Sequence, residues 1–597
     1  MLSTWSKDTG LNSTTDYDQM RKFFSQKARY VFHNGIRFDK PHIERLLGIK
    51  IQGDVIDSLA LSWTMFPDRN RHGLESWGED FGIKKPKITN WENLPVETYI
   101  NRCQEDVKIN VRVWNYIYLK LKGLYKKEED LWRYVDYINF KMHCAALQEE
   151  SGWLVDAEYC EKSLKELITE RNKKTDELRK LMPKVPVKET KTLPKRLTRK
   201  DGTLTKIGQS WYDLLGEQNL PKETYEVEVV KDYQEGNPGS TQQVKDWLFS
   251  LGWVPRTFKH KKDKDGNPKE IPQINLENGK GICPSIKDLY EKEPNLEYLD
   301  GLSVLNHRIP ILKGFLDTRD KDGYVKAQIQ GLTNTLRFQH SHPCVNLPKY
   351  GKLYADGIRG SLIAPKGYTL CGADMSGLED RLKQHFIYPL DPDYVESMNR
   401  KDYDPHLTLA VFAGMITQDQ MDKYLSGEDK SIKPIRDQAK NGNYACQYNA
   451  YPPRLAITCG ITLDKAKELF NGYWKLNWAI KEVSSNQKII TMGEEMWMLN
   501  PVSGFWYSLR SKNDVFSTLV QGTASFVFDL WVKYILEERE QLTAQFHDEV
   551  VLCIRKGFEQ QASDLCTRAL EKTNNELKLN RQLDIGIQFG DRYSLIH

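Results

Sequence analysis

The chain has 597 residues, of which 39% are hydrophobic and 28% charged, and its 86 basic and 82 acidic residues leave a net charge of +4. This length predicts about four domains, since a domain usually holds about 150 residues. No run of 18 apolar residues and no charged-then-apolar leader follows Met1, so the composition argues against a membrane span and a secretory signal and predicts a soluble intracellular protein.

The cysteines and the clusters of charge indicate which stabilising links and which partners the chain can have. The ten cysteines contain no Cys-x-x-Cys pair, which argues against a disulfide framework and a cysteine zinc site. The net charge is too small to indicate a polyanionic partner, but basic residues gather at 184–206 and again at 256–264. Such clusters fit contact with a phosphate backbone, and a solvated surface loop would have the same composition.

The hydrophobic pattern changes along the chain. Residues 31–118 alternate apolar runs with turn residues, which predicts a small α/β domain. Apolar spacings of three and four at 128–182 predict long helices that break near Ser151 and Gly152. Residues 183–276 are rich in Pro, Gly and Lys, which predicts an insertion or linker of low regularity, interrupted by a compact stretch at 242–251.

An extended apolar run at 367–374 ends in the carboxylate of Asp374 and precedes a stretch with helical spacing at 376–382. An acid at the end of a strand and before a helix is held at a sheet edge, where a metal ion can reach it. Taken singly, an aspartate in this position is more often a helix N-cap.

Two β-rich runs at 542–546 and 550–554 flank His547, Asp548 and Glu549, which predicts a hairpin with acids at its tip. Carboxylates from two different strands could hold a pair of divalent ions about 3.5 to 4 Å apart for in-line phosphoryl transfer. A polar hairpin tip without a metal is the alternative.

The segment between these two acids predicts a helix with a chemically distinct face. Pro434 suits the first turn, and Arg436, Lys440, Tyr444 and Tyr448 recur every four residues, so they share one face. Two cations followed by two aromatic rings could bind a triphosphate and stack a base. An exposed amphipathic stripe would look similar.

In this order the three segments resemble motifs A, B and C of family A DNA polymerases. Residues 374–381 are similar to motif A, 436–448 to the fingers helix of motif B, and 547–550 to motif C. Further matches lie at 335–337, 346–348, 404–406 and 521–524.

The resemblance implies a two-metal site. Asp374 and Asp548 would bind two Mg²⁺ ions, and Glu549 would be an accessory carboxylate. Arg436, Lys440 and His406 would contact the triphosphate, and Lys440 would also be a candidate proton donor to the departing pyrophosphate.

The same resemblance implies how the substrates are chosen. Glu379 would exclude a ribose 2′-OH, which favours DNA over RNA synthesis, and Tyr444 would stack near the incoming dNTP base. Because Tyr444 replaces the commoner Phe, it implies tolerance of dideoxynucleotides. The residues expected to contact primer-template DNA are Arg337, Gln521, His547 and Tyr448.

The N-terminal half resembles the DnaQ-like 3′–5′ exonuclease of these polymerases. Residues 34–39 and 103–107 are similar to its second and third motifs, which implies that Asp39 and Asp106 are metal ligands. The first motif, Asp-x-Glu, does not occur before His33, and Arg102 stands where a Tyr normally orients the attacking water. We therefore expect either a chain that begins after the true start or a domain with little or no exonuclease activity.

Within family A, the sequence resembles replicative polymerases of short-tailed, podovirus-type bacteriophages, on segments at 57–62, 72–78, 252–255 and 590–597. In that subgroup a thumb insertion can recruit a thioredoxin-like processivity factor, and the basic stretch 184–206 lies in the corresponding region. A grip on duplex DNA is the alternative role. The resemblance also implies a replicative helicase-primase partner and a location in the cytoplasm of the infected bacterial host.

The resemblance predicts an α/β multi-domain fold, in which an RNase H-like exonuclease-type domain without its first strands precedes a right-hand polymerase fold. The predicted boundaries are 1–120 for the exonuclease-like domain, 121–310 for a helical thumb with a basic insertion at 184–276, 311–390 for the palm with motif A, 391–510 for the fingers with motif B, and 511–597 for the palm with motif C.

Two other functions stay open. A single-subunit RNA polymerase would share the metal acids and the cationic helix, but Glu379 and the exonuclease-like N-terminus argue against it. A catalytically inert DNA-binding scaffold derived from a polymerase would not need Asp374, Lys440 and Asp548, which are all present.

Overall fold

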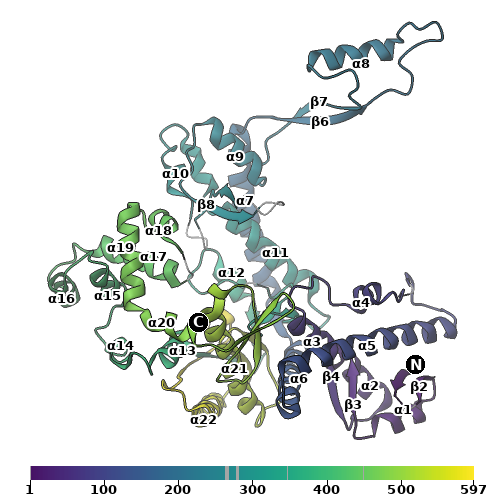
Figure 1. Ribbon diagram of the computed structural model, residues 1–597, viewed down its shortest axis with the longest axis vertical. Coiled ribbons are helices and arrows are strands. Elements are labelled where there is room, and N and C mark those ends of the chain that lie inside the picture. The colour runs from purple at the N-terminus through teal and green to yellow at the C-terminus, as the bar shows by residue number, and fades with distance from the viewer. Residues whose placement is uncertain are drawn as a thin grey trace. The chain divides into compact units, whose positions relative to one another are not determined.

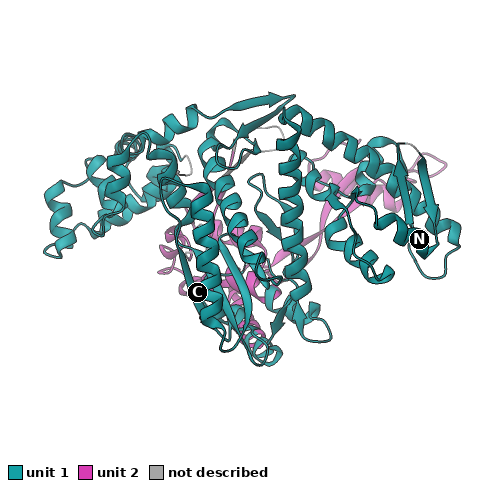
Figure 2. Cartoon of the chain, turned by 90° about the horizontal axis from the view of Figure 1, so that it is seen from below, with its two compact units in different colours: residues 1–163, 311–597 teal, residues 164–310 magenta. Residues whose placement is uncertain are grey.

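The computed structural model describes residues 2–7, 9–85, 87–262, 268–276, 281–345, 347–447 and 450–596. The chain forms two compact units (Figure 2). Unit 1 holds Met1–Ser163 and Ile311–His597, and unit 2 holds Leu164–Pro310. Helix α6 therefore belongs to unit 1, although it lies inside the predicted thumb interval 121–310.

The first part of unit 1 combines a parallel strand pair with surrounding helices. Strands β3 and β4 pair in parallel, whereas β1 and β2 form a separate antiparallel hairpin. Helix α6 ends at Ser151 because Gly152 adopts a φ of 63°, so the predicted break is confirmed. The elements are β1 (Leu2–Ser6), β2 (Gly10–Thr14), α1 (Tyr17–Phe24), β3 (Arg29–Phe32), η1 (Gly35–Asp39), α2 (Lys40–Leu47), β4 (Asp54–Asp57), α3 (Ser58–Met65), α4 (Leu74–Phe81), α5 (Val96–Leu124) and α6 (Glu128–Ser151).

The centre of unit 1 is a four-stranded antiparallel sheet in the order β18-β19-β14-β20. Its strands are β14 (Tyr368–Met375), β18 (Ala544–Phe546), β19 (Glu549–Arg555) and β20 (Ile585–Gly590). Helices α21 (Val515–Leu536) and α22 (Glu559–Leu577) contribute to the same hydrophobic core as the strands, through residues such as Trp531 and Leu570 against Val550 and Leu552. This core fixes β14 and β19 side by side.

In the part of the chain that the structure describes, the segment Lys512–Leu536 is long and apolar enough to cross a membrane. It overlaps α21, and 78% of its most apolar window is buried inside the protein. Its apolar character is therefore that of a core helix, which must be hydrophobic on most of its faces to pack between neighbours.

Further strands of unit 1 form smaller sheets. Strands β5, β10 and β13 form a three-stranded sheet, β11 and β12 form a hairpin, and β15, β16 and β17 form a meander. Their bounds, with that of a short helix, are β5 (Trp153–Val155), β10 (Tyr324–Val325), β11 (Ile329–Leu332), β12 (Phe338–His340), α12 (Ala355–Gly360), β13 (Leu362–Ile363), β15 (Ile489–Met492), β16 (Glu495–Leu499) and β17 (Trp506–Leu509).

A helical subregion follows β14 in the chain (Figure 1). Helices α15, α17, α18 and α19 pack on one another around Leu409, Leu455 and Leu469. Gly442 allows the close approach of α17 to α19, since a Cβ there would come within 2.4 Å of Leu469 Cδ2. The helices are α13 (Leu378–Ile387), α14 (Pro392–Met398), α15 (Pro405–Phe412), α16 (Gln418–Ser426), α17 (Lys433–Gln447), α18 (Pro452–Cys459), α19 (Leu463–Leu476) and α20 (Trp478–Ser485).

Unit 2 corrects one prediction. The interval 183–276 is not a linker of low regularity: β6 and β7 form a long antiparallel ribbon, and Figure 1 shows α8 at its end. The ribbon is exposed on most of both faces, so it lacks the alternation of apolar residues that reveals a strand in a sequence. The elements after α7 (Ala157–Leu181) are β6 (Val185–Thr192), α8 (Lys206–Glu217), β7 (Glu226–Gln234), α9 (Thr241–Ser250), β8 (Phe258–Lys262), β9 (Pro268–Pro272), α10 (Pro284–Lys287), η3 (Pro294–Leu299) and α11 (Leu302–Thr318).

Unit 2 has two hydrophobic clusters of its own. Trp211 and Leu215 of α8 pack with Val227 of β7 near the end of the ribbon. A larger cluster includes Trp247 of α9, a helix that matches the predicted compact stretch to within one residue at each end. The ribbon and α8 are therefore an ordered structure with a small core.

Candidate active site

The central sheet brings the predicted metal acids together. Asp374 near the end of β14 lies opposite Glu549 at the start of β19. The backbone N–H of Met375 donates a hydrogen bond to the carbonyl oxygen of Asp548 at 3.0 Å. Two acids separated by more than 170 residues in the sequence thus stand on neighbouring strands, next to the hairpin tip at His547, whose φ is 57°.

Each of these carboxylates has a defined setting. Burial raises the pKa of Asp548, against the lowering effect of its own backbone hydrogen bond and the charges of His547, Arg337 and Lys349. Glu549 is buried and accepts a hydrogen bond from the Tyr593 hydroxyl at 3.0 Å. The site therefore has one half-buried aspartate at the tip and one glutamate fixed behind it.

Asp374 faces a close backbone neighbour. A Cβ on Gly586 of β20 would come within 3.0 Å of its Oδ1, so only glycine leaves the carboxylate its present room. Asp374 is not the N-cap of the following helix, because that position belongs to Gly377. The N-cap alternative for Asp374 is therefore wrong.

Helix α17 carries the predicted cationic and aromatic face. Lys440 and Tyr444 are exposed and Arg436 is half-buried, whereas Ala439 and Cys446, which lie outside this stripe, are buried. The exposed face is thus the one with the charges and the ring. Tyr448, the last predicted member of this face, lies outside the described residues.

Helix α15 supports α17 from the side. Asp404 caps α15 by accepting hydrogen bonds from the backbone N–H groups of His406 and Leu407, and its Oδ2 lies 2.6 Å from Nε of Arg436. His406 is buried, which lowers its pKa, and its ring lies 5.7 Å from that of Tyr444. The structure therefore groups His406 with Arg436 and Tyr444.

The predicted sugar gate has an ionic partner. Nη2 of Arg337 lies 2.5 Å from Oε1 of Glu379, which stands in the first turn of α13. Glu379 and Gln521 both line a cavity of about 780 Å³, together with Lys383, Tyr451 and Trp474. Two residues predicted for different roles, primer contact and sugar exclusion, thus form one pair beside a cavity.

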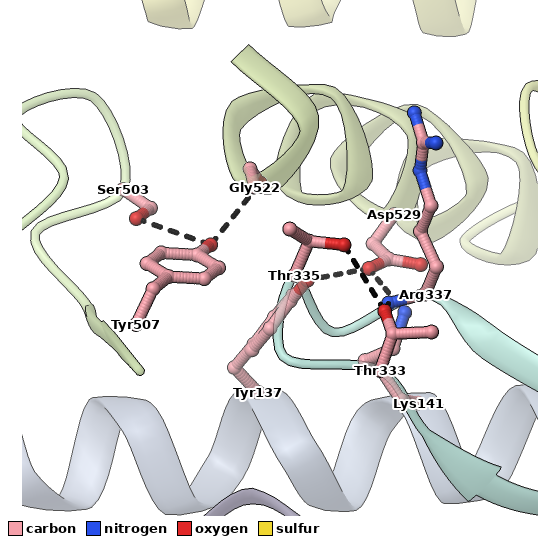
Figure 3. Close-up of polar contacts among 9 residues, drawn as sticks. All are labelled: Tyr137, Lys141, Thr333, Thr335, Arg337, Ser503, Tyr507, Gly522 and Asp529. Carbon is pink, nitrogen blue, oxygen red and sulfur yellow. Dashed lines mark hydrogen bonds and ion pairs between the residues drawn. The ribbon is translucent and has the colours of Figure 1, made fainter. Parts of the chain in front are cut away.

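A buried polar network lies near Arg337 (Figure 3). Lys141 and Tyr137 on α6 both bind Asp529 of α21, at 2.6 and 2.5 Å. The Lys141 and Asp529 side chains are 3% and 4% exposed, so the ion pair is shielded from water. The Tyr507 hydroxyl donates a hydrogen bond to the carbonyl oxygen of Gly522, the residue after Gln521. Helix α21 is therefore anchored at Gly522 as well as at Asp529.

The exonuclease-like residues are also close to one another. Burial, and the nearby carboxylates of Asp57 and Asp106, raise the pKa of Asp39 to about 6. Asp106 forms ion pairs with Lys85 Nζ at 2.8 Å and with Arg102 Nε at 3.5 Å. Asp106 is thus paired with two cations of the chain itself.

Asp57 adds a third acid that the sequence did not single out as a ligand. It is buried, caps α3, and accepts backbone hydrogen bonds from Asn34, Ile36, Leu59 and Ala60. These bonds occupy both carboxylate oxygens of Asp57, so it holds the turn that leads to Asp39.

The sequence did not predict several residues that contact the site residues. They are Asp404, Tyr593, Lys349 and Lys85. Only Asp404 had a local signal, because an Asp before Pro405 is a common start of a helix. The others act across tertiary contacts that no local pattern records.

Among the residues that the structure describes, no group of three or more His, Cys, Asp or Glu side chains forms a metal-binding cluster. The donors at the active site still suit Mg²⁺, which is usually bound through one or two carboxylates and completes its shell with waters and substrate phosphates. Asp374 near the end of β14 and Asp548 in the turn just before the neighbouring strand β19 provide such a pair.

Comparisons with known proteins place this geometry in a family. The family model described as DNA polymerase family A matches residues 216–594, which is more than half of the chain. DNA polymerase I from two strains of Helicobacter pylori is 25% identical over 345 residues and 26% identical over 338 residues. Each alignment covers 54% of this chain and 34% of the relative, so the chain matches about a third of the length of these relatives.

The fold has a solved counterpart. The POL domain of Pol1 from M. smegmatis, in complex with DNA primer-template and dNTP, superposes with a TM-score of 0.66 and covers 98% of this chain and 89% of that one. At 15% identity this likeness concerns the fold alone. The predicted α/β multi-domain polymerase fold is confirmed, whereas the exonuclease-like assignment and the domain boundaries stay predictions. On the match of the family model, the chain belongs to DNA polymerase family A.

Proposed function

We propose that this protein is a template-directed DNA polymerase that adds dNTPs to the 3′-OH of a primer paired with a template. The observation that carries this proposal is the pairing of β14 with β19, which places Asp374 beside the Asp548–Glu549 hairpin in a family A chain. The cationic face of α17 supplies the second requirement, a binding surface for a triphosphate.

Divalent metal ions are the general cofactors of this family, and we propose two Mg²⁺ ions held by Asp374 and Asp548, with Glu549 as the accessory acid. When bound, such ions favour ionisation of the primer 3′-OH and offset charge on the phosphates. The half-buried position of Asp548 raises its pKa, so its carboxylate is a better metal ligand at neutral than at acidic pH.

The residues of α17 and α15 would position the nucleotide. Arg436, Lys440 and His406 would contact the triphosphate, and Tyr444 would stack near the incoming base. The primer 3′-OH would lose its proton to solvent, and its oxygen would form a bond to the α-phosphorus while the bond from that phosphorus to pyrophosphate breaks. Lys440, which is exposed on this face, would give a proton to the departing pyrophosphate.

The choice of DNA over RNA would depend on Glu379. A side chain of this size beside the sugar would collide with a 2′-OH. We therefore favour DNA synthesis over the alternative of a single-subunit RNA polymerase. Arg337, Gln521, His547 and Tyr448 would contact primer or template.

We further propose a role in phage DNA replication in the cytoplasm of an infected bacterium, with a helicase-primase and a thioredoxin-like processivity factor as partners. The support is the sequence resemblance to podovirus-type polymerases and the ordered ribbon with α8 at 185–234. The curated relatives that match are bacterial DNA polymerase I proteins, so this role is more specific than the family assignment.

Proofreading is proposed to be weak or absent. Lys85 and Arg102 pair with Asp106, one of the two acids expected to bind metal in the exonuclease-like region. Since a lysine ammonium competes with a metal ion for the same oxygens, metal binding there would be disfavoured.

Primer extension tests these proposals. A labelled primer-template with Mg²⁺ is supplied with dNTPs, with rNTPs or with no nucleotide, using wild type and Asp548→Asn. Extension by dNTPs that is lost in Asp548→Asn, while binding of primer-template persists, supports the polymerase. DNA binding without extension would favour the inert scaffold, efficient rNTP extension would favour an RNA polymerase, and shortening of the primer without nucleotide would contradict the weak exonuclease.

A further inference from the structure

The turn between β11 and β12 has a tightly bonded backbone that presents Arg337. Leu336 in this turn has a φ of 64° and a buried side chain, so the core holds a backbone conformation that leucine rarely adopts. The hydroxyl of Thr333 accepts a hydrogen bond from the Arg337 N–H at 3.1 Å, and the Thr333 N–H donates to the Arg337 carbonyl at 2.9 Å. Figure 3 shows this turn next to α6 and α21.

The strand after this turn is also anchored. Phe338 directly follows Arg337 in the chain. Nζ of Lys141, which is bound to Asp529, lies 4.6 Å from the centre of the Phe338 ring. Asn334 in the turn donates to the Ser508 carbonyl at 3.3 Å. The backbone of Arg337 is therefore fixed on both sides, and a fixed backbone allows its side chain to position a neighbour.

That neighbour is Glu379. The Arg337 guanidinium lies 2.5 Å from its carboxylate, and the two side chains are 20% and 41% exposed. A glutamate that is partly exposed has several rotamers, and an unrestrained one can turn away from a sugar hydroxyl. An ion pair to a fixed arginine removes that freedom, because the guanidinium presents its donors in a rigid plane.

We propose that Arg337 is a positioning residue for sugar selection, which holds the Glu379 carboxylate where it excludes a ribose 2′-OH. This inference rests on the proposed function, since it assumes that Glu379 is the sugar gate of a DNA polymerase. An arginine has five N–H donors, so a contact to Glu379 is compatible with a second contact to the primer.

The two roles of Arg337 predict different kinetic results. Loss of a primer contact weakens primer binding and lowers incorporation of dNTPs and rNTPs alike. Loss of the hold on Glu379 raises rNTP incorporation relative to dNTP incorporation. The ratio of kcat/KM for a dNTP to kcat/KM for the matching rNTP therefore separates the two roles.

The experiment measures this ratio for wild type, Arg337→Met, Glu379→Ala and the double variant on the full chain, with the Kd for primer-template measured separately. We expect the ratio to fall about tenfold or more in Arg337→Met and further in Glu379→Ala. In the Glu379→Ala background, Arg337→Met should not lower the ratio again, because Arg337 acts through Glu379.

Two further variants serve as controls for this experiment. Arg337→Lys keeps the charge without the planar fork, so it replaces Arg337→Met if that variant does not fold, and we expect a smaller fall in the ratio. Arg568→Met breaks the ion pair between Arg568 on α22 and Glu538, whose charged atoms lie 2.7 Å apart, and should leave the ratio unchanged.

The outcomes separate this inference from the function on which it rests. An unchanged ratio in Arg337→Met, with a reduced one in Glu379→Ala, overturns the role of Arg337 alone. An additive fall in the double variant also overturns it. If wild type incorporates no dNTP, or Glu379→Ala keeps full discrimination, the proposed function or the gate itself fails, and this inference fails with it.

Discussion

Asp404 and Arg436 form an ion pair in which Oδ2 of the aspartate lies 2.6 Å from Nε of the arginine. Asp404 also caps α15, the helix that carries His406. Burial opposes its ionisation, but hydrogen bonds from the backbone of Leu407 and His406 and from Arg436 lower the pKa of Asp404. The carboxylate is therefore charged at neutral pH and orients Arg436 before any triphosphate binds.

This dual role predicts that two substitutions of Asp404 will differ. Asp404→Ala removes both cap and ion pair, whereas Asp404→Asn keeps a good cap and removes the charge. We expect Asp404→Ala to be less stable than Asp404→Asn by about 1 kcal/mol in urea unfolding. Both should raise the KM for dNTP about three- to tenfold, because Arg436 loses its orientation. Equal stabilities would contradict the cap, and an unchanged KM would contradict the orienting role.

The buried pair of Lys141 and Asp529 predicts a large effect on stability. Lys141→Met leaves the Asp529 carboxylate buried without its cation, which should cost about 3 to 5 kcal/mol in urea unfolding. Lys141→Met combined with Asp529→Leu should recover most of that loss, because no buried charge is then left. The exposed pair of Arg568 and Glu538 is the control, and Arg568→Met should destabilise the fold far less, because water screens this pair. A loss in Lys141→Met no larger than in this control would disprove the argument.

The raised pKa of Asp39, about 6, predicts a pH-dependent stability. The folded protein holds the proton of Asp39 more tightly than the unfolded chain, so this proton stabilises the fold below about pH 4 and the stabilisation is lost as pH rises through 6. Asp39→Asn, which is always neutral, should therefore be more stable than wild type at pH 7.5, by about 1 to 3 kcal/mol.

Thermal unfolding between pH 4 and 7.5 checks this prediction. The advantage of Asp39→Asn should shrink as the pH falls towards 4. Asp18→Asn, at a carboxylate that is 89% exposed, is the control for a substitution of the same kind at the surface. A constant difference between Asp39→Asn and wild type over this range would exclude the raised pKa as its cause.

The hydrogen bond from Tyr593 to Glu549 predicts an effect on turnover. Tyr593→Phe removes the donor that fixes the accessory carboxylate, so kcat should fall about three- to tenfold while the Kd for primer-template is unchanged. Tyr534→Phe is the matched control, because that hydroxyl binds Glu576 on α22. Equal kcat values for the two variants would argue that Tyr593 does not act through Glu549.

The three motif elements could be predicted from the sequence because each carries a local signal. An apolar run before Asp374 marks a strand, Pro434 marks a helix start, and the polar tip at His547 marks a hairpin. The structure has a strand, a helix and a hairpin at these places. The chemical roles assigned to these residues stay predictions.

The contacts that join these elements could not be predicted in the same way. Tyr593 and Glu549 are 44 residues apart, and Arg337 and Glu379 are 42 apart, so only the tertiary fold brings the members of each pair together. The ribbon was missed for another reason. Its lysines alternate with acids that pair across the strands, such as Lys188 with Glu228 at 3.0 Å, and in a sequence this pattern looks like a charged linker.

The ribbon of β6 and β7 also has a consequence for how this chain can be altered. Val185 lies opposite Gln234, so the chain enters and leaves this segment at one place. Trp211 and Leu215 of α8 pack with Val227 inside the same segment, so deletion of the segment would remove this small core as a whole. The segment is in effect a removable cassette, which a short turn or a foreign module can replace without changing the spacing of the chain on either side.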